Sequence, residues 1–170
     1  MAKNTKGVSE TVTENIFREF YGSSTFIEKS AIPSELGFQS KKNSSSSKGY
    51  PDFLLEEEDY IIVVEAKATS QNDAIVEVQH YMQKNNVTKD IIGIAVSGQK
   101  LDELKVDYFL KTNDSNICLN IQENSSLLTL KNIYNIYWQK RYGESVTAES
   151  LIKTLNELNK TFNDNNKVKD

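Results

Sequence analysis

The stretch that decides the fold is GYPDF at residues 49–53, followed by YIIVVEAK at residues 60–67. Gly49 and Pro51 signal a turn, and an acidic turn at 56–59 separates a short strand over 52–56 from the apolar run. An uninterrupted aliphatic run is typical of a central strand that is buried on both faces. The sequence therefore predicts a β-hairpin whose second strand lies inside a sheet.

The segment before the hairpin predicts an amphipathic helix over residues 9–21. Ser9 can cap its start, and Val12, Ile16 and Phe20 fall four residues apart. This spacing puts the three apolar side chains on one face of the helix, which we expect to pack on the sheet.

The segments after the hairpin extend the α/β pattern. The expected elements are a helix at 72–85 capped by Asn72 or Asp73, a buried strand at 90–97, a strand pair at 104–111 and 116–122, and a helix at 147–162. Residues 126–139 fit either a helix or a strand. The order predicts an α/β domain built on a mixed sheet flanked by helices.

The composition limits the number of domains and the available chemistry. With 170 residues, 38% of them hydrophobic, and a net charge of −4, the chain fits one domain with a tail. We place the domain at 1–145 and a C-terminal helix and tail at 146–170. A single cysteine, Cys118, and a single histidine, His80, exclude an internal disulfide, a zinc site of Cys and His ligands, and a site of several histidines. Any active site must use mainly carboxylates, lysine, tyrosine and amides.

No targeting or membrane segment is visible in the sequence. Residues 1–10 are polar and lack the apolar core of a signal peptide. The longest apolar runs, 61–64 and 91–96, are too short to span a bilayer. We therefore expect a soluble, cytoplasmic protein with no membrane partner.

The segment QSKKNSSSSKG at 39–49 is polar, and it carries Lys41, Lys42 and Lys48. It cannot pack in a core, so a flexible surface loop is expected. The whole chain has 18 lysines and 2 arginines. Lysine suits phosphates as a point charge, whereas the arginine fork reads guanine. If nucleic acid is the partner, these lysines are candidates to hold its backbone rather than to read its sequence.

Three charged residues of the hairpin form the candidate site. Side chains alternate along a strand, so Glu65 and Lys67 share one face while Ala66 points away. An antiparallel hairpin can bring Asp52 close to Glu65, and two carboxylates in a partly buried site repel each other unless a cation lies between them. Hard oxygen ligands without soft partners favour Mg²⁺. Lys67 could then hold a water and stabilise charge on a phosphate.

A plainer interpretation of the same residues is a polar strand end with a salt bridge. Glu65 and Lys67, however, close a run of four aliphatic residues. At that depth charges are costly unless they serve a purpose. Both interpretations stay open on the residues alone.

The combination of Pro-Asp with Glu-Ala-Lys, between two helices, resembles the PD-(D/E)xK nuclease superfamily. TENIFR at 13–18 resembles the T-E-x-φ-φ-R opening (φ apolar) of the nuclease segment in N-6 adenine DNA methylase and type IIG-like restriction-modification polypeptides. Nuclease domains related to this segment also occur in type I restriction subunits. The lysine-rich loop, VVEAKA at 63–68, Tyr81 and IAVSG at 94–98 follow in that family's order. The resemblance covers about residues 9–110.

The resemblance implies a role for each matching residue. Asp52 and Glu65 would bind Mg²⁺, for which Mn²⁺ can substitute, with the Ala66 carbonyl as a further ligand. Lys67 would position the attacking water, and Glu14 would be the extra acid beside the metal. On helical geometry alone Glu14 projects away from the apolar face of its helix, so a solvated carboxylate is the alternative.

Many relatives carry Q-x-x-x-Y on the helix after the hairpin. Tyr81 matches the tyrosine, but the position four residues before it is Glu77, not glutamine. Gln79 lies two residues before Tyr81, on a different face of the helix. We expect Glu77, Tyr81 and Gln79 as supporting residues of the site.

These observations predict a Mg²⁺-dependent DNA endonuclease domain of a restriction-modification system, with a restriction-endonuclease-like fold. The expected partners are DNA, an attached or separate methylase and target-recognition region, and a second copy for double-strand cleavage. The helix and tail at 146–170 would be the linker to the methylase region. Two alternatives stay open: a catalytically idle DNA-binding module on the same fold, and a protein-interaction module.

Overall fold

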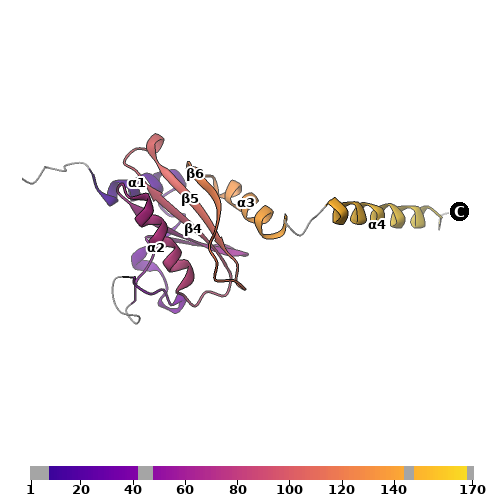
Figure 1. Ribbon diagram of the computed structural model, residues 1–170, viewed down its shortest axis with the longest axis horizontal. Coiled ribbons are helices and arrows are strands. Elements are labelled where there is room, and N and C mark those ends of the chain that lie inside the picture. The colour runs from indigo at the N-terminus through magenta and orange to yellow at the C-terminus, as the bar shows by residue number, and fades with distance from the viewer. Residues whose placement is uncertain (1–7, 42–47, 144–147, 168–170) are drawn as a thin grey trace, which may run out of the picture. The chain divides into compact units, whose positions relative to one another are not determined.

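The computed structural model describes residues 8–41, 48–143 and 148–167 of the chain (Figure 1). The chain divides into two compact units, 1–133 and 134–170. The boundary expected between residues 145 and 146 falls outside the described residues.

Six strands in the described part of the first unit form one open sheet, in the order of the sequence. They are β1 (Ile27–Glu28), β2 (Phe53–Glu56), β3 (Tyr60–Lys67), β4 (Asp90–Ser97), β5 (Lys105–Lys111) and β6 (Leu119–Ser125). β3 and β4 run parallel, and every other neighbouring pair is antiparallel. The sheet is therefore mixed.

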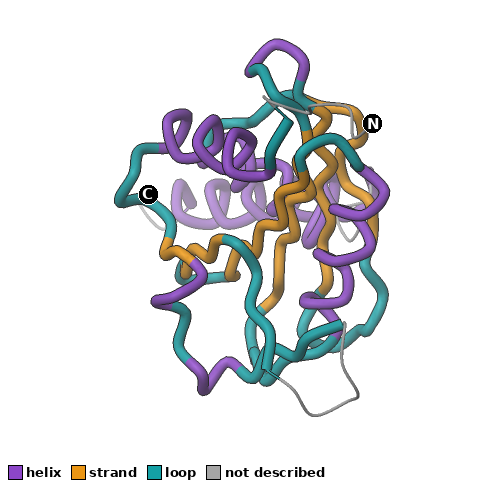
Figure 2. Tube along the Cα trace, turned by 90° about the vertical axis from the view of Figure 1, so that its left-hand side faces the viewer, coloured by secondary structure: helices purple, strands orange, loops and turns teal. Residues whose placement is uncertain are grey.

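Helices α1 (Glu10–Tyr21) and α2 (Gln71–Gln83) cover opposite faces of this sheet. Phe53 of β2 stacks on Phe17 of α1, with ring centroids 4.8 Å apart, whereas its neighbour Leu54 belongs to the apolar cluster under α2. α2 is also the crossover between the parallel strands β3 and β4. Helices lie on both sides of the strands (Figure 2), which confirms the expected α/β class with a mixed, helix-flanked sheet.

Two further helices follow the sheet. α3 (Leu130–Tyr142) begins in the first unit and ends in the second, and α4 (Ala148–Lys167) lies wholly in the second. None of the helices in the described parts of the chain is long and apolar enough to cross a bilayer.

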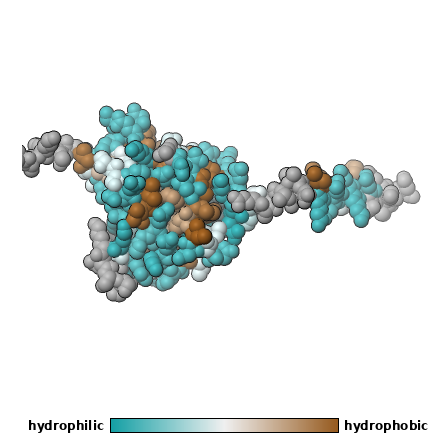
Figure 3. All heavy atoms as spheres, viewed as in Figure 1, coloured by the Kyte–Doolittle hydropathy of each residue, from teal (hydrophilic) through white to brown (hydrophobic). Residues whose placement is uncertain are grey.

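The hairpin predicted over residues 52–67 is present. β2 and β3 pair antiparallel, and β3 is buried along its whole length except for the partly exposed Lys67. Ile62, Val63 and Val64 of this strand are fully buried. The surface shown in Figure 3, by contrast, is mostly hydrophilic. Burial from both sides explains why this strand shows no alternation of apolar and polar residues.

Some element boundaries differ from the expectation. α2 begins at Gln71, because the Ser70 hydroxyl caps the helix by accepting a hydrogen bond from the Asp73 amide. The expected caps, Asn72 and Asp73, lie inside the helix. The ambiguous segment 126–139 follows the end of β6 and contains most of α3.

The buried face of α1 is not the one that its apolar residues indicate. Thr13 and Phe17 are buried, whereas Phe20 is 39% exposed. Thr13 does not count as apolar, so the hydropathy pattern centres the face on Val12 and Ile16, about 100° around the helix from Thr13 and Phe17. With Thr13 against the sheet, the neighbouring Glu14 turns toward the open end of the hairpin.

Thr13 anchors α1 to the end of β3. Its hydroxyl lies 3.0 Å from the carbonyl oxygen of Lys67 and 2.7 Å from that of Gly98. Gln99 Nε2 donates to Thr13 Oγ1 at 3.1 Å and to the Ser9 carbonyl at 2.9 Å, and Gln99 Oε1 accepts from the Ser9 amide at 3.0 Å. These contacts hold the start of α1 beside Lys67.

We expect Thr13→Val to lower the free energy of unfolding by about 1–3 kcal/mol, because the variant removes the one hydroxyl donor that these two carbonyls share while the side-chain shape is kept. Thr13→Ser should retain most of the stability. Thr25→Val is the matched control, since the Thr25 hydroxyl bonds the Tyr21 carbonyl at 2.6 Å at the other end of α1. Urea unfolding measures all three variants. An equal loss in Thr13→Val and Thr25→Val would contradict the anchoring role.

Candidate active site

Asp52 is fixed at the open end of the hairpin by two hydrogen bonds to β3. Its amide donates to the Val64 carbonyl at 2.9 Å, and its Oδ2 accepts from the Ala66 amide at 2.8 Å. The Asp52 carboxylate thus gives the Ala66 amide the acceptor that a backbone carbonyl of β2 would otherwise provide. The Asp52 side chain is only 4% exposed.

The main chain of Ala66 faces the same place. In an extended strand the N–H and C=O of one residue point to the same neighbouring strand. Because the Ala66 amide donates to Asp52, the Ala66 carbonyl is also directed to the side of β3 on which Asp52 lies. It is therefore in position to be the further oxygen ligand that the resemblance implies.

Glu65 is a buried carboxylate on the α2 face of β3. It is 2% exposed, and its Oε2 meets no hydrogen-bond partner among the described residues. Burial raises the pKa of Glu65 well above its ordinary value, and the nearby Asp52 and Glu77 raise this pKa further. Such a carboxylate gains most from a cation, because ionisation in a buried site needs a compensating charge.

Lys67 connects three carboxylates from three elements. Its Nζ lies 2.9 Å from Glu77 Oε2, 3.8 Å from Glu65 Oε1 and 4.0 Å from Glu10 Oε2. Burial alone would lower the pKa of Lys67, but the hydrogen bond to Glu77 and the charges of all three carboxylates outweigh it, so the pKa is raised. Lys67 is therefore an ammonium that can orient a water or a phosphate, not a base.

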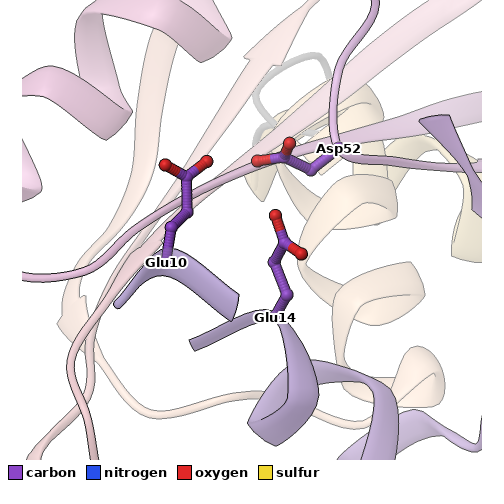
Figure 4. A group of neighbouring side chains, drawn as sticks. All are labelled: Glu10, Glu14 and Asp52. Atoms are coloured by element: carbon purple, nitrogen blue, oxygen red, sulfur yellow. The ribbon is translucent and has the colours of Figure 1, made fainter. Parts of the chain in front are cut away.

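Glu10 and Glu14, one turn apart on α1, point toward Asp52 (Figure 4). One carboxylate oxygen of each of the three residues lies within 4.8 Å of the others. Burial raises the pKa of Glu14, and the charge of Asp52 adds to this, while Arg18 at 3.5 Å partly offsets it. The structure brings Glu14 to the site, and it adds Glu10, which sequence reasoning did not select. The spacing of four residues between two glutamates was the available signal.

Lys29 is a second residue that sequence reasoning missed. Its Nζ lies 3.1 Å from Asp52 Oδ1. Pairing of β1 with β2 places Glu28 opposite Phe53, so the next residue along the chain comes beside Asp52. A strand of two residues leaves no recognisable pattern in the sequence, and no local signal pointed to Lys29.

An open groove of about 380 Å³ lies over the acidic residues. It is lined by Glu10, Lys29, Ser40, Lys41, Gly49, Tyr50, Glu65, Lys67, Glu77 and Tyr81. The two ends of the 39–49 segment meet here, and a Cβ on Gly49 would lie 2.6 Å from Ser40 Cα, so this approach requires glycine. A hydrogen bond of 3.0 Å between His80 Nε2 and the Gln39 carbonyl connects the segment to α2.

α2 brings two of its three expected residues to the groove. Glu77 contacts Lys67, and Tyr81 lines the groove one turn further along. Burial raises the pKa of Tyr81, and the charge of Glu65 adds to it. Gln79 lies two residues from each of them, so it faces another side of the helix. The structure does not bring Gln79 to the groove.

Two of the three lysines of the 39–49 segment lie in the described part of the chain. Lys41 is exposed and lines the groove. Lys48 is exposed and forms a β-bridge with Gln39 at the base of the segment, outside the groove lining. Lys42 lies outside the described residues.

The donor set fits a hard divalent cation. Five carboxylates lie near two ammonium groups, those of Lys29 and Lys67. The carboxylates are those of Glu10, Glu14, Asp52, Glu65 and Glu77. Negative charge is in excess, all donors are oxygens, and the buried Glu65 Oε2 is without a partner among the described residues, which suits Mg²⁺ or Mn²⁺.

Comparison with protein-family models, curated proteins and solved structures finds no match for the chain.

We expect Glu65→Gln to stabilise the metal-free protein at neutral pH. Because burial raises the folded-state pKa of Glu65 above its unfolded value, protonation of Glu65 stabilises the fold at low pH, and this stability is lost as the pH rises through the folded-state pKa. The neutral amide avoids the loss, which predicts a gain of about 1–3 kcal/mol at neutral pH and little gain in acid.

Thermal unfolding with a chelator, from acidic to neutral pH, measures this difference between variant and parent. Glu58→Gln is the matched control, since it changes an exposed carboxylate in the turn between β2 and β3. A gain in Glu65→Gln that is the same at every pH would contradict the effect of burial on the Glu65 carboxylate.

Proposed function

We propose that this chain is a Mg²⁺-dependent DNA endonuclease domain of the PD-(D/E)xK type, which hydrolyses phosphodiester bonds within a restriction-modification system. The observation that carries the proposal is that Glu65 and the Lys67 ammonium line one open groove, while the buried Asp52 lies close enough for its charge to act on Glu65. A polar strand end would not need a buried carboxylate oxygen without a donor, because such a group costs stability. Binding of a cation gives Glu65 a role.

Each residue then has a distinct task. Asp52, Glu65 and the Ala66 carbonyl would hold the cation, and Glu14 would extend the set of acids. When bound, the cation supplies Lewis acidity and lowers the pKa of a coordinated water. Lys67, held by Glu77 at 2.9 Å, orients the water and stabilises negative charge on the phosphate. Hydrolysis adds this water across one P–O bond, leaving a phosphate on one fragment and a hydroxyl on the other.

DNA is the substrate class that the groove supports. Lys41 lines the groove and Lys48 lies at the base of the same segment, and both would be available to backbone phosphates. With 2 arginines in the chain, sequence recognition would come from an attached or separate target-recognition region. α4 supports such a partner, because four of its large apolar side chains are more than half exposed: Ile152, Leu155, Leu158 and Phe162. A second copy would allow cleavage of both strands.

Asp52→Asn, Glu65→Gln and Lys67→Met should each lower the cleavage rate by about 10²–10⁴-fold, because each removes a charged group that acts on the water or the phosphate. The assay is nicking of supercoiled plasmid with Mg²⁺ or Mn²⁺. Glu58→Gln is the control for the acids, because Glu58 is exposed. Lys89→Met is the control for Lys67, because Lys89 contacts Glu56 and the Glu57 carbonyl and not the groove. Full nicking activity in Lys67→Met would disprove the role of that lysine.

Changing Lys41 and Lys48 to serine should weaken DNA binding without altering sequence preference. The slope of log affinity against log salt should flatten by about one unit for each lost phosphate contact. Fluorescence anisotropy over a salt series measures it, with Lys89→Ser as the control. An unchanged slope would leave this segment as a surface loop without a part in binding.

Calorimetry with Mg²⁺ separates an enzyme from an idle module on the same fold. The proposed function requires that the parent protein binds the ion and that Asp52→Asn weakens this binding at least several-fold. Absence of binding in the parent would overturn the proposal.

A further inference from the structure

Lys29 is attached to Asp52 at both of its ends. Its amide donates to the Asp52 carbonyl at 3.1 Å, and its Nζ lies 3.1 Å from Asp52 Oδ1. The backbone contact fixes where the side chain starts, while the side chain itself is 55% exposed. The ammonium group can therefore leave Asp52 without any change in the backbone.

The two lysines of the site differ in how firmly they are held. Lys67 is 19% exposed and has carboxylates from α1, α2 and β3 within 4.0 Å. Lys29 has one carboxylate partner within this distance, Asp52, among the described residues. Lys67 is thus a fixed part of the site, and Lys29 is the cation that can be exchanged.

Asp52 is also the residue at which a divalent cation and Lys29 would compete. Its Oδ2 is already bonded to the Ala66 amide, and its Oδ1 is the atom that Lys29 contacts. Glu10 and Glu14 approach the same carboxylate. A cation bound among these oxygens would repel the Lys29 ammonium, because like charges only a few ångströms apart interact strongly at partly buried positions.

Open space is available on both sides of Lys29. It lines the groove over Lys67, and it also lines a second hollow of about 270 Å³ formed by Glu14, Arg18, Glu28, Lys29, Ser30 and Asp52. A nucleic-acid strand lying in the groove would bring phosphates within reach of the released ammonium.

We propose that Lys29 exchanges partners during the reaction cycle: it neutralises Asp52 in the metal-free protein, and it binds a backbone phosphate of the nucleic-acid substrate once a divalent cation occupies Asp52. This inference rests on the proposed function. It assigns Lys29 a substrate-binding role that exists only in the metal-loaded protein. Metal and substrate then promote each other's binding, because coupling between two ligands is reciprocal.

The test uses the full chain and the variants Lys29→Met, Lys29→Gln and Lys29→Arg, with Lys89→Met as the matched control. Lys89 pairs with Glu56 at 3.4 Å, away from the groove. Calorimetry with Mn²⁺ and without DNA gives the metal affinity. Anisotropy of a short labelled duplex, over a salt series with a chelator or with Ca²⁺, gives the DNA affinity and its salt slope. Thermal unfolding checks that each variant is folded.

Lys29→Met and Lys29→Gln should bind Mn²⁺ several-fold more tightly than the parent, because the competing cation is gone. With Ca²⁺ their salt slope should be smaller than that of the parent by about one unit, and with chelator it should equal that of the parent. Lys29→Arg should keep the parent slope in both conditions.

Two results would overturn the exchange while leaving the nuclease proposal intact. One is a parent that binds Mn²⁺ through Asp52 with an affinity that Lys29→Met does not increase. The other is a loss of slope that is the same with chelator and with Ca²⁺, which would make Lys29 a permanent phosphate contact. A parent that binds no Mn²⁺ would instead overturn the proposed function itself, and the exchange with it.

Discussion

The buried carboxylate of Glu65 is the constraint on which the rest of the site depends. β3 is enclosed by neighbouring strands and by helices, and it carries Glu65 to a position that is 2% exposed. An ionised carboxylate there needs a compensating charge. Lys67 lies on the same face, at 3.8 Å, but it also compensates Glu77 and Glu10. Lys67 is thus shared among three carboxylates, and under the proposed function a divalent cation would supply the remaining positive charge.

Polar anchors at the starts of α1 and α2 help to hold these like charges together. Thr13 and Gln99 fix the start of α1 to the end of β3. The start of α2 is held in a similar way, because Gln71 Nε2 donates to Asp107 Oδ2 at 2.8 Å and its Oε1 accepts from Ser97 Oγ at 2.8 Å. These hydrogen bonds add to the apolar packing of α1 and α2 on the sheet and oppose the repulsion among the carboxylates. The anchors make a charged groove compatible with a stable fold.

The parts that could be predicted from the sequence are those whose geometry is local. The hairpin follows from a turn signal and an aliphatic run, and its geometry alone brings Asp52 near Glu65. The side that α1 turns to the sheet could not be predicted in this way. It depends on Thr13, whose hydroxyl meets the carbonyls of Lys67 and Gly98, 54 and 85 residues away. Glu10 enters the site for the same reason.

Lys29 shows the second limit of local reasoning. It reaches Asp52 only because two residues, Ile27 and Glu28, pair with β2, and a strand of that length has no periodicity to detect.

Under the proposed function, the difference between the two lysines would let the metal-free protein fold and still accept a divalent cation. The Lys29 side chain is 55% exposed, so water can solvate its ammonium group once it leaves Asp52, while a divalent cation would compensate the buried Asp52 carboxylate. The Lys67 side chain is 19% exposed and is shared among three carboxylates, so removal of its ammonium group would leave more negative charge uncompensated. If both lysines were held as firmly as Lys67, the metal-free site would resist a cation. If both were as exposed as Lys29, Glu65 would have no internal partner in the metal-free state. One fixed and one exchangeable lysine satisfy both requirements.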